Sequence, residues 1–239
     1  MHKVTAAMEA GEKPNAGLIQ GMGQLMGDMR RNDALVDGAG LLPSATRVRL
    51  RFAGGKRTLQ KGPYKGANEL VAAMLMLKIR DMDEAIDWAT RYARAVGDAD
   101  LEIGPVTEGW DLGLMAKPPD APLRCLVLHR ADADSEAGKP RSKAVVAALA
   151  SLTDEMRAAG VLLASERVRP SREGTRIKVA NKQTTVIDGP FAESKEMIAG
   201  YIIMNAPSVA ATQPWTTRFA EVIGDVEMDV LPLYADPSP

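Results

Sequence analysis

The sequence predicts an α+β protein made of two similar units in tandem, and two observations lead to this prediction. First, the chain matches itself when it is shifted by 127 residues: residues 43–106 align with 170–233 without a gap, and sixteen of these 64 pairs are identical. Unrelated chains of ordinary composition would share roughly four. Second, each copy contains predicted strands and helices in the order β-α-β-β-α-β. The 239 residues suffice for two domains of about 110 to 120 residues each.

The repeat is clearest at residues that have special backbone or packing roles. Lys61-Gly-Pro-Tyr64 aligns with Asp188-Gly-Pro-Phe191, and Trp88 aligns with Trp215. The period is far longer than the roughly 20 to 50 residues of a solenoid unit, so each copy is expected to be a domain. The expected division is a first domain at 1–113, a linker at 114–122 and a second domain at 123–239.

The second copy shows the element order most clearly. Residues 123–128 are an apolar run with β character, and Ser142 is placed to cap a helix that Gly160 ends. The further elements expected in this copy are a strand at 161–168, a hairpin of strands at 175–179 and 184–187, a buried strand at 197–204, a helix from Ser208 to about 223 and a strand at 226–233. This is the ferredoxin-like plan, an antiparallel sheet with both helices on one face. Since the other face needs a cover, the sheets of the two copies are expected to pack face to face.

The first copy follows the same order with weaker signals. A helix at 18–29 contains three glycines, which lower its helix propensity, and Asp81 is placed to cap a second helix. The strands expected in this copy are 47–52, 58–60, 70–77 and 100–106.

The first strand of the second copy has almost no counterpart in the first copy. His2 aligns with His129, so Met1 falls on Leu128. In a ferredoxin-like sheet this strand is central, and without it backbone groups would be left unpaired in the middle of the sheet. Either residues 2–8 form a short strand, or the first unit is incomplete.

Composition excludes several classes of protein. The formal net charge is −1 and the pI is about 6.2; Arg47, Arg49 and Arg51 have the spacing of one solvated strand face, so nucleic acid is not an expected partner. The single cysteine, Cys125, excludes an intrachain disulfide and is expected to be a buried thiol in a strand. No apolar run reaches the roughly 18 residues of a membrane-spanning helix and no signal peptide opens the chain, so a cytoplasmic protein is expected.

One segment resembles a known family. The sequence Thr185-Val-Ile-Asp-Gly-Pro-Phe-Ala-Glu-Ser-Lys-Glu-Met-Ile-Ala-Gly-Tyr201 is similar to the YCII-related family, in the branch named after its DGPF signature. The resemblance extends upstream to residues 159–163 and 175–179, and downstream to Trp215 and residues 227–233. It covers the second copy, whereas the first copy resembles the family more weakly and has Lys-Gly-Pro-Tyr in place of Asp-Gly-Pro-Phe.

The resemblance implies a fold and a range of functions. Related proteins pair two ferredoxin-like units into a dimeric α+β barrel, which the two copies here would form within one chain. The family's activity is mostly undefined, and the resemblance implies small-molecule binding in the barrel cleft of the second domain, with lyase-like acid–base chemistry by a His on the first helix and an Asp. Neither predicted first helix, 18–29 or 142–159, contains a His. The alternative that the resemblance implies is a non-enzymatic accessory or regulatory protein associated with an extracytoplasmic-function sigma factor.

The candidate site centres on the signature turn. Asp188 and His129, which ends the first strand of the second copy, are the catalytic candidates because a carboxylate and a neutral imidazole could exchange a proton. The candidate ligand-binding residues are Gly189, Pro190, Phe191, Glu193 and Glu196. The alternative is purely structural, since Asp, Gly and Pro form a turn between two strands without any further function. The counterpart of Asp188 is Lys61, so only one copy would keep an acid.

Metals and cofactors have no clear signal in the sequence, and none is expected. One Cys and two distant His give no zinc spacing, and the run Asp132, Asp134 and Glu136 lacks the Gly and the final Glu of an EF-hand loop. No nucleotide-binding glycine motif occurs in its required context. The expected partners are a small molecule, a second copy of the chain in a homodimer, and a sigma factor, without nucleic acid or membrane.

Overall fold

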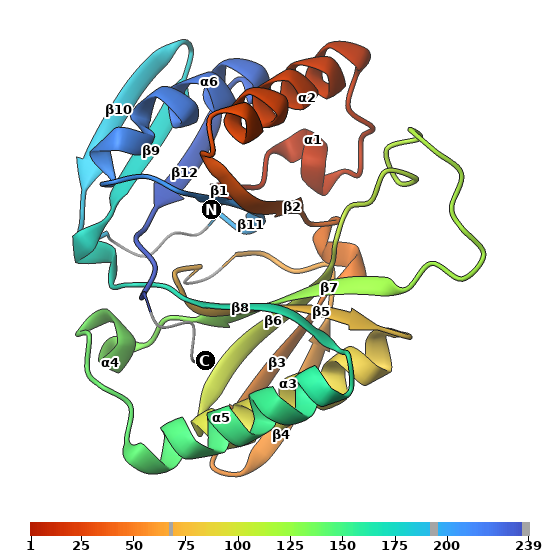
Figure 1. Ribbon diagram of the computed structural model, residues 1–239, viewed down its shortest axis with the longest axis vertical. Coiled ribbons are helices and arrows are strands. Elements are labelled where there is room, and N and C mark those ends of the chain that lie inside the picture. Colours follow the sequence, from red (N-terminus) through yellow and green to blue (C-terminus); the bar gives the residue numbers. More distant parts are fainter. Residues whose placement is uncertain (67–68, 192–195, 236–239) are drawn as a thin grey trace.

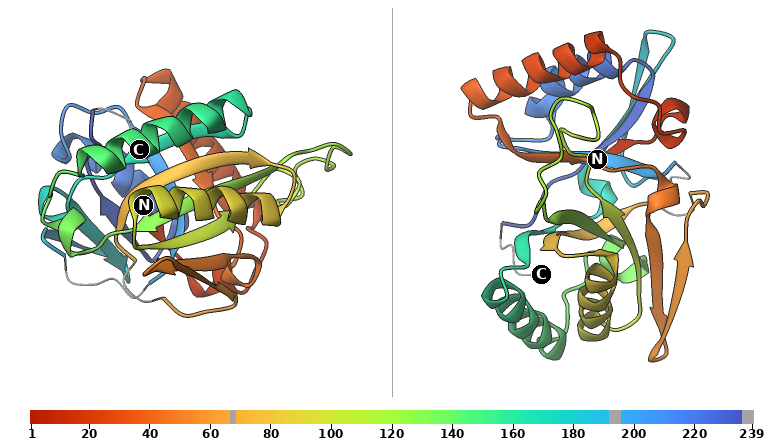
Figure 2. Two further views of the ribbon diagram at one scale, coloured as in Figure 1. Left: turned by 90° about the horizontal axis from the view of Figure 1, so that it is seen from below. Right: turned by 90° about the vertical axis from the view of Figure 1, so that its right-hand side faces the viewer.

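The chain folds into two antiparallel sheets that face each other, with helices on the two outer faces (Figure 1). The computed structural model describes residues 1–66, 69–191 and 196–235. The right-hand view of Figure 2 shows the layers from the side, in the order helices, sheet, sheet and helices. Neither sheet closes into a barrel. The predicted α+β class, with two ferredoxin-like sheets in one chain, is confirmed.

Within the described residues, each sheet has six strands. Sheet A has the order β10-β9-β12-β1-β11-β2, with β10 at Gln183–Asp188, β9 at Thr175–Ala180, β12 at Val226–Val230, β1 at His2–Lys3, β11 at Ile198–Met204 and β2 at Leu35–Gly40. Sheet B has the order β4-β3-β6-β7-β5-β8, with β4 at Lys56–Lys61, β3 at Val48–Ala53, β6 at Ala99–Pro105, β7 at Leu123–Arg130, β5 at Val71–Ile79 and β8 at Leu162–Arg167.

Two long helices cover each sheet. They are α2 at Ala16–Arg31 and α6 at Gln213–Ile223 on sheet A, and α3 at Met82–Val96 and α5 at Lys143–Ala158 on sheet B. The short helical turns are α1 at Ala6–Glu9, α4 at Ala133–Glu136, η1 at Ser44–Thr46, η2 at Ser171–Glu173 and η3 at Ala210–Thr212. Among the described residues, no helix has both the length and the apolar composition that crossing a membrane requires.

The helix ends follow local sequence signals. The Ser142 side chain accepts a hydrogen bond from the backbone N–H of Val145, as expected of an N-cap, and the Asp81 side chain accepts one from Glu84. Helix α6 begins at Gln213 rather than at Ser208, because Pro214 is tolerated in the first turn of a helix but not in its interior.

Each sheet combines strands from both copies of the repeat. Strands β1 and β2 of the first copy join sheet A, whose other strands belong to the second copy. Strands β7 and β8 of the second copy join sheet B, whose other strands belong to the first copy. The boundaries expected at 113 and 123 separate the two copies of the repeat in the sequence. Each ferredoxin-like sheet, however, contains strands from both copies.

The first copy does supply a central strand, but a short one. β1 contains two residues and lies between β12 and β11, with His2 opposite both Gly200 and Met228. Its counterpart β7 contains eight residues. Of the two alternatives left open by the sequence, the short strand is therefore the one observed. Strand β2 was not among the strands expected in this copy, although it matches β8 at the repeat offset; it is the other strand that this copy gives to sheet A.

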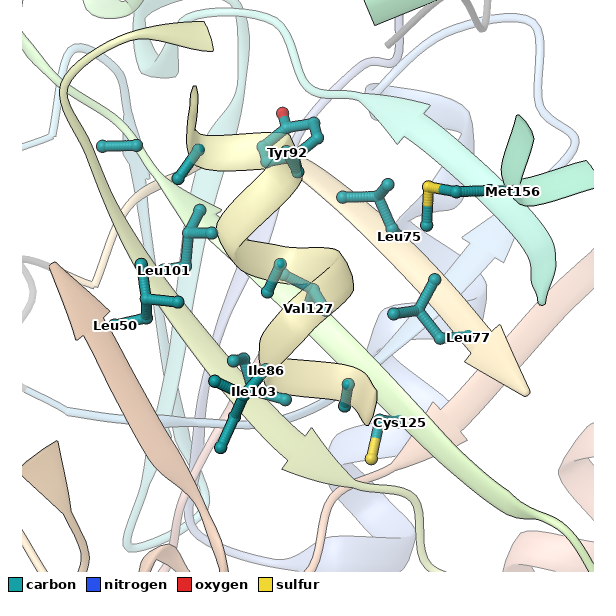
Figure 3. Close-up of a cluster of buried hydrophobic side chains, with 14 of the residues drawn as sticks. Leu50, Leu75, Leu77, Ile86, Tyr92, Leu101, Ile103, Cys125, Val127 and Met156 are labelled. Atoms are coloured by element: carbon teal, nitrogen blue, oxygen red, sulfur yellow. The ribbon is translucent and has the colours of Figure 1, made fainter. Parts of the chain in front are cut away.

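The largest core lies between sheet B and its helices (Figure 3). Leu50, Leu101 and Val127 of the sheet pack against Tyr92 of α3, and Met156 of α5 closes the same cluster. Fully burying an apolar side chain stabilises the fold by about 1.5 to 3 kcal/mol. This cluster therefore anchors the second copy's β7 and α5 to the first copy's strands. Cys125 lies in it as a buried free thiol, as the sequence predicts, and burial raises its pKa to about 12.

A second core lies between the two sheets. Met74 and Met76 point away from the helices and pack in one cluster with Leu126, also of sheet B, and with Ile198 and Tyr201 of sheet A. The neighbouring residues on β5 belong to the helix-side core, as the alternation of a strand requires. Strands β5 and β7 of sheet B are thus buried on both faces, which explains their nearly continuous apolar sequences.

We expect sheet A to open before sheet B. Its central strand has two residues in place of eight, so fewer ladder hydrogen bonds and less buried apolar area hold sheet A together. Native-state hydrogen exchange should show faster exchange in β11 than at the matching positions of β5. Equal protection of β11 and β5 would contradict this expectation.

Candidate functional site

The signature turn requires glycine in both copies. A Cβ atom on Gly189 would lie 1.8 Å from the backbone oxygen of Ser171, and one on Gly62 would lie 1.8 Å from that of Ser44. No side chain can occupy that space, because both neighbouring atoms are backbone. The peptide bonds that follow these glycines, to Pro190 and Pro63, are both cis.

The aromatic residue of the signature turn is buried over an arginine. The ring of Phe191 lies 4.6 Å from the guanidinium carbon of Arg176, and the Phe191 backbone N–H donates to the Ser171 hydroxyl at 3.2 Å. In the other copy, Tyr64 lies 3.8 Å from the guanidinium carbon of Arg49. Each contact is a cation–π interaction, so the turn holds one arginine of each sheet in place.

In each copy, a glutamate of a short helix binds the backbone that packs against the signature turn. These residues are Glu136 of α4 and Glu9 of α1. The carboxylate of Glu136 accepts a hydrogen bond from the Ser171 backbone N–H at 3.2 Å. Glu9 accepts the matching bond from the Ser44 backbone N–H at 3.2 Å. These pairs explain why the two copies share a glutamate at this position.

Arg176, which packs against the Phe191 ring, belongs to a buried cluster of charged residues in sheet A. Arg176 donates to Asp229 through two nitrogens, at 2.6 and 3.1 Å, and the Lys3 amine lies 2.8 Å from the same carboxylate. Lys3 and Asp229 are each only 2% exposed. Burial alone would raise the pKa of Asp229, but the hydrogen bonds from Arg176 and the positive charge of Lys3 outweigh burial and hold the pKa below its ordinary value.

Sheet B contains the matching cluster with more members. Arg49 and Arg130 both bind Glu69, at 2.7 and 2.9 Å, and both approach Glu102. Arg49, Glu102 and Arg130 occupy the positions of Arg176, Asp229 and Lys3, so both copies keep this charge pattern although most aligned positions differ.

The ionic cluster of sheet B also contains Arg47, which links the two sheets by hydrogen bonds. Its Nη1 atom donates to Glu102 at 2.8 Å and to the backbone oxygen of Ile198 in sheet A at 2.7 Å. Its side chain is 1% exposed, so the prediction that Arg47 lies on a solvated strand face is wrong. The matching residue of the second copy is Gly174, so this cross-sheet bond is made on one side only.

The two catalytic candidates lie in different sheets. His129 is in β7 of sheet B, where its Nδ1 atom lies 3.2 Å from the Tyr92 hydroxyl. Asp188 ends β10, the edge strand of sheet A, where its exposed carboxylate accepts a hydrogen bond from the Thr175 hydroxyl at 3.3 Å. The described contacts of these two residues are thus with Tyr92 and Thr175. A proton exchange between His129 and Asp188 remains a prediction from the sequence.

The remaining candidates fall in different surroundings. Phe191 is buried, and Glu196 is exposed beside the start of β11. Glu193 lies outside the residues that the structure describes. Glu69, the counterpart of Glu196, is by contrast 3% exposed inside the ionic cluster of sheet B. The sequence alone does not predict that Glu69 is buried and Glu196 exposed, because both copies have a glutamate at this position.

Sequence reasoning missed a cavity of about 390 Å³ between β11 and β12. Its walls are mainly apolar and include residues 202–204 of β11 and residues 230–233. His2 and Asp229 lie at the end where β1 begins, and Met74 reaches the cavity from sheet B. The signal that could have located it is the short first strand, because β1 is the element that separates β11 from β12.

Three hydroxyl groups of the cavity wall are already hydrogen-bonded within the protein. The hydroxyls of Thr212 and Thr216 donate to nearby backbone oxygens, and the Tyr201 hydroxyl donates to Asp37 at 2.6 Å. Burial lowers the pKa of His2 to about 3, so this imidazole is neutral at physiological pH. Within the described part of the chain, no group of three or more His, Cys, Asp or Glu is arranged to hold a metal ion.

Substituting the signature glycine should destabilise the fold. Gly189→Ala places a methyl group against a backbone oxygen and should lower the free energy of unfolding by about 2 kcal/mol or more in chemical denaturation. The matched control is Gly23→Ala in α2, where a Cβ meets no atom within 4 Å and should stabilise by up to about 1 kcal/mol. Equal effects of the two substitutions would show that the close approach does not constrain this turn.

His129 should titrate far below an ordinary histidine. Burial, followed by the positive charge of Arg141, lowers its pKa to about 4, so NMR of the imidazole should show a midpoint near pH 4. Because the folded pKa lies below the ordinary value of about 6.5, the free energy of unfolding is greatest above pH 6.5 and falls as the pH drops toward 4, by about 3 kcal/mol. His129→Asn should reduce this pH dependence. A midpoint near 6.5 would be incompatible with the buried site.

Comparison with known proteins agrees with the second copy's signature. Residues 123–228 match the family model of the YCII-related domain. No curated protein and no solved structure gave a match. The N-terminal half contributes most strands of a second, similar sheet, in keeping with a degenerate tandem copy. The chain therefore contains a YCII-related domain at residues 123–228.

Proposed function

We propose that this protein binds an apolar molecule in the cavity between β11 and β12. The observation that carries the proposal is the cavity itself, whose volume of about 390 Å³ falls within the range of roughly 300 to 1,000 Å³ that is typical of ligand pockets. The cavity lies in sheet A, which contains the signature turn of the second copy.

The chemistry of the walls favours an apolar ligand. The hydroxyls of Tyr201, Thr212 and Thr216 already donate within the protein. Asp229 is neutralised by Lys3 and Arg176. An apolar ligand would gain from burial against these walls without breaking any of these hydrogen bonds.

The same geometry favours binding over lyase-like catalysis. The family resemblance implies a His and an Asp acting together, but His129 is bound to Tyr92 in sheet B and Asp188 is exposed on the edge of sheet A. Neither of them is among the residues that line the cavity.

The proposal can be tested with the uncharged fluorescent probe N-phenyl-1-naphthylamine. Its fluorescence should rise on binding to the wild-type protein. Ala206→Phe fills the cavity wall and should weaken binding at least tenfold. Ala211→Phe is the matched control, because Ala211 is exposed and does not line the cavity, so binding should be unchanged.

Two results would reject the proposal. One is the absence of any fluorescence change with the wild-type protein. The other is equal binding by Ala206→Phe and Ala211→Phe, provided that thermal unfolding shows both variants to be folded.

A further inference from the structure

The two copies form equivalent edge strands that differ in their chemistry. β10 is the outermost strand of sheet A, and β4 has the equivalent place in sheet B (Figure 1). In the part of the chain that the structure describes, each has one strand neighbour, β9 for β10 and β3 for β4. All six residues of each strand are exposed. Such an edge presents backbone donors and acceptors to which a further strand can add.

Alternate residues of β10 direct their backbone groups to the open edge. The turn between β9 and β10 has two residues, and at the far end of the hairpin the Gly189 N–H donates to the Gly174 oxygen. Because bonding direction alternates along an antiparallel strand, the odd-numbered residues of β10 bond to β9. The even-numbered residues therefore direct their N–H and C=O groups outward, and these are Thr184, Val186 and Asp188.

Strand β4 is protected against pairing by its charge. At the repeat offset, its outward-directed residues are Arg57, Leu59 and Lys61. A symmetric antiparallel pair of two β4 strands, centred on Leu59, would place Arg57 directly opposite Lys61 of a second copy. Like charges opposite each other destabilise a strand pair, and basic side chains are a common means of keeping edge strands apart.

Strand β10 lacks this protection and is complementary to itself. Residues 184–187 are all β-branched, which favours strands, and none of them is charged. A symmetric pair of β10 strands centred on Val186 places Thr184 opposite Asp188 of a second copy. The same combination is present within the molecule, where the Thr175 hydroxyl donates to the Asp188 carboxylate at 3.3 Å across the β9–β10 pair.

The register centred on Val186 uses the whole edge. It pairs all three outward-directed residues and gives roughly six ladder hydrogen bonds. Val186 is 52% exposed and lies on the same sheet face as Ile177, where it would meet Val186 of the second copy. On the opposite face, Thr185 would meet Ile187, which is also exposed. Pairing would thus cover apolar area that the single molecule leaves in water.

A pair between β10 and β4 of a second copy is the competing arrangement. It would place Asp188 opposite Arg57. The Arg57 guanidinium, however, already donates to Thr90 of α3 at 3.1 Å. Such a pair would also leave one β10 and one β4 uncovered at its ends, so it would extend into an open chain of molecules. The symmetric pair instead closes on itself and covers both β10 edges.

We propose that β10 is the surface through which this protein binds a second copy of itself. Two β10 strands pair antiparallel about a two-fold axis at Val186, and the A sheets of the two molecules become one continuous sheet. None of the β10 residues lines the cavity between β11 and β12, so this interaction goes beyond the proposed ligand binding and does not depend on it.

The test is sedimentation velocity of the full chain at about 1 to 100 µM, the range in which a small interface dissociates. The wild-type protein should form a dimer as its concentration rises. Val186→Lys places like charges opposite each other and should weaken self-association at least tenfold. Leu59→Lys is the matched control, the same change at the counterpart in β4, and should leave the dimer unchanged. Both side chains are exposed, so both variants should keep the wild-type melting temperature.

Thr184 tests the register, because it is exposed and would lie opposite Asp188 of the second copy. Thr184→Lys would form an opposite-charge pair there and should tighten the dimer about two- to fivefold. Thr184→Glu would form a like-charge pair and should weaken the dimer by a similar factor.

Four outcomes would overturn the proposal. One is a wild-type protein that stays monomeric throughout this concentration range, and another is a dimer that survives Val186→Lys. A third is equal loss of association in Val186→Lys and Leu59→Lys with species larger than a dimer in the wild type, which would indicate pairing of β10 with β4. The last is an equal response to Thr184→Lys and Thr184→Glu, which is incompatible with the register centred on Val186.

Discussion

Both sheets depend on the central strand, whose backbone must be hydrogen-bonded on two sides at once. In sheet B this strand is β7, which comes from the second copy and lies between two strands of the first. In sheet A it is β1, which comes from the first copy and lies between two strands of the second. Because each half supplies the other's central strand, neither half has a complete sheet of its own. The hydrogen-bond requirement therefore ties the two halves together without any covalent cross-link.

The space between the sheets combines apolar packing with buried charge. Desolvation offsets much of the attraction within a buried ion pair, so such pairs contribute little net stability, although removing one partner strands the other charge. The retained pattern of Arg49, Glu102 and Arg130 in one copy and Arg176, Asp229 and Lys3 in the other instead fixes how each turn and first strand meet their sheet. Arg47 adds a directional bond from sheet B to sheet A, which apolar packing alone would not provide.

In the signature turn, the glycine and the aromatic residue have the same structural role in both copies, whereas the first residue differs between the copies. Its glycine is required by the nearby backbone oxygen, and its aromatic ring covers an arginine in both copies. The first residue of the turn is exposed at the end of a strand in each case, so Asp188 in one copy can correspond to Lys61 in the other despite the reversal of charge. A motif can thus be retained as a fold element while its charged position changes.

The sequence by itself determined the repeat, the order of elements, the capped helix starts at Asp81 and Ser142, and the shortness of the first strand. These follow from local rules and from comparing two copies of one pattern. Only the tertiary structure decided which sheet each strand joins, since β1 and β7 each lie between strands of the other copy. It also decided that His129 and Asp188 lie in different sheets, that Glu69 is buried while Glu196 is exposed, and that a cavity separates β11 from β12. Strand exchange and burial depend on contacts between residues distant in the chain, which local periodicity does not encode.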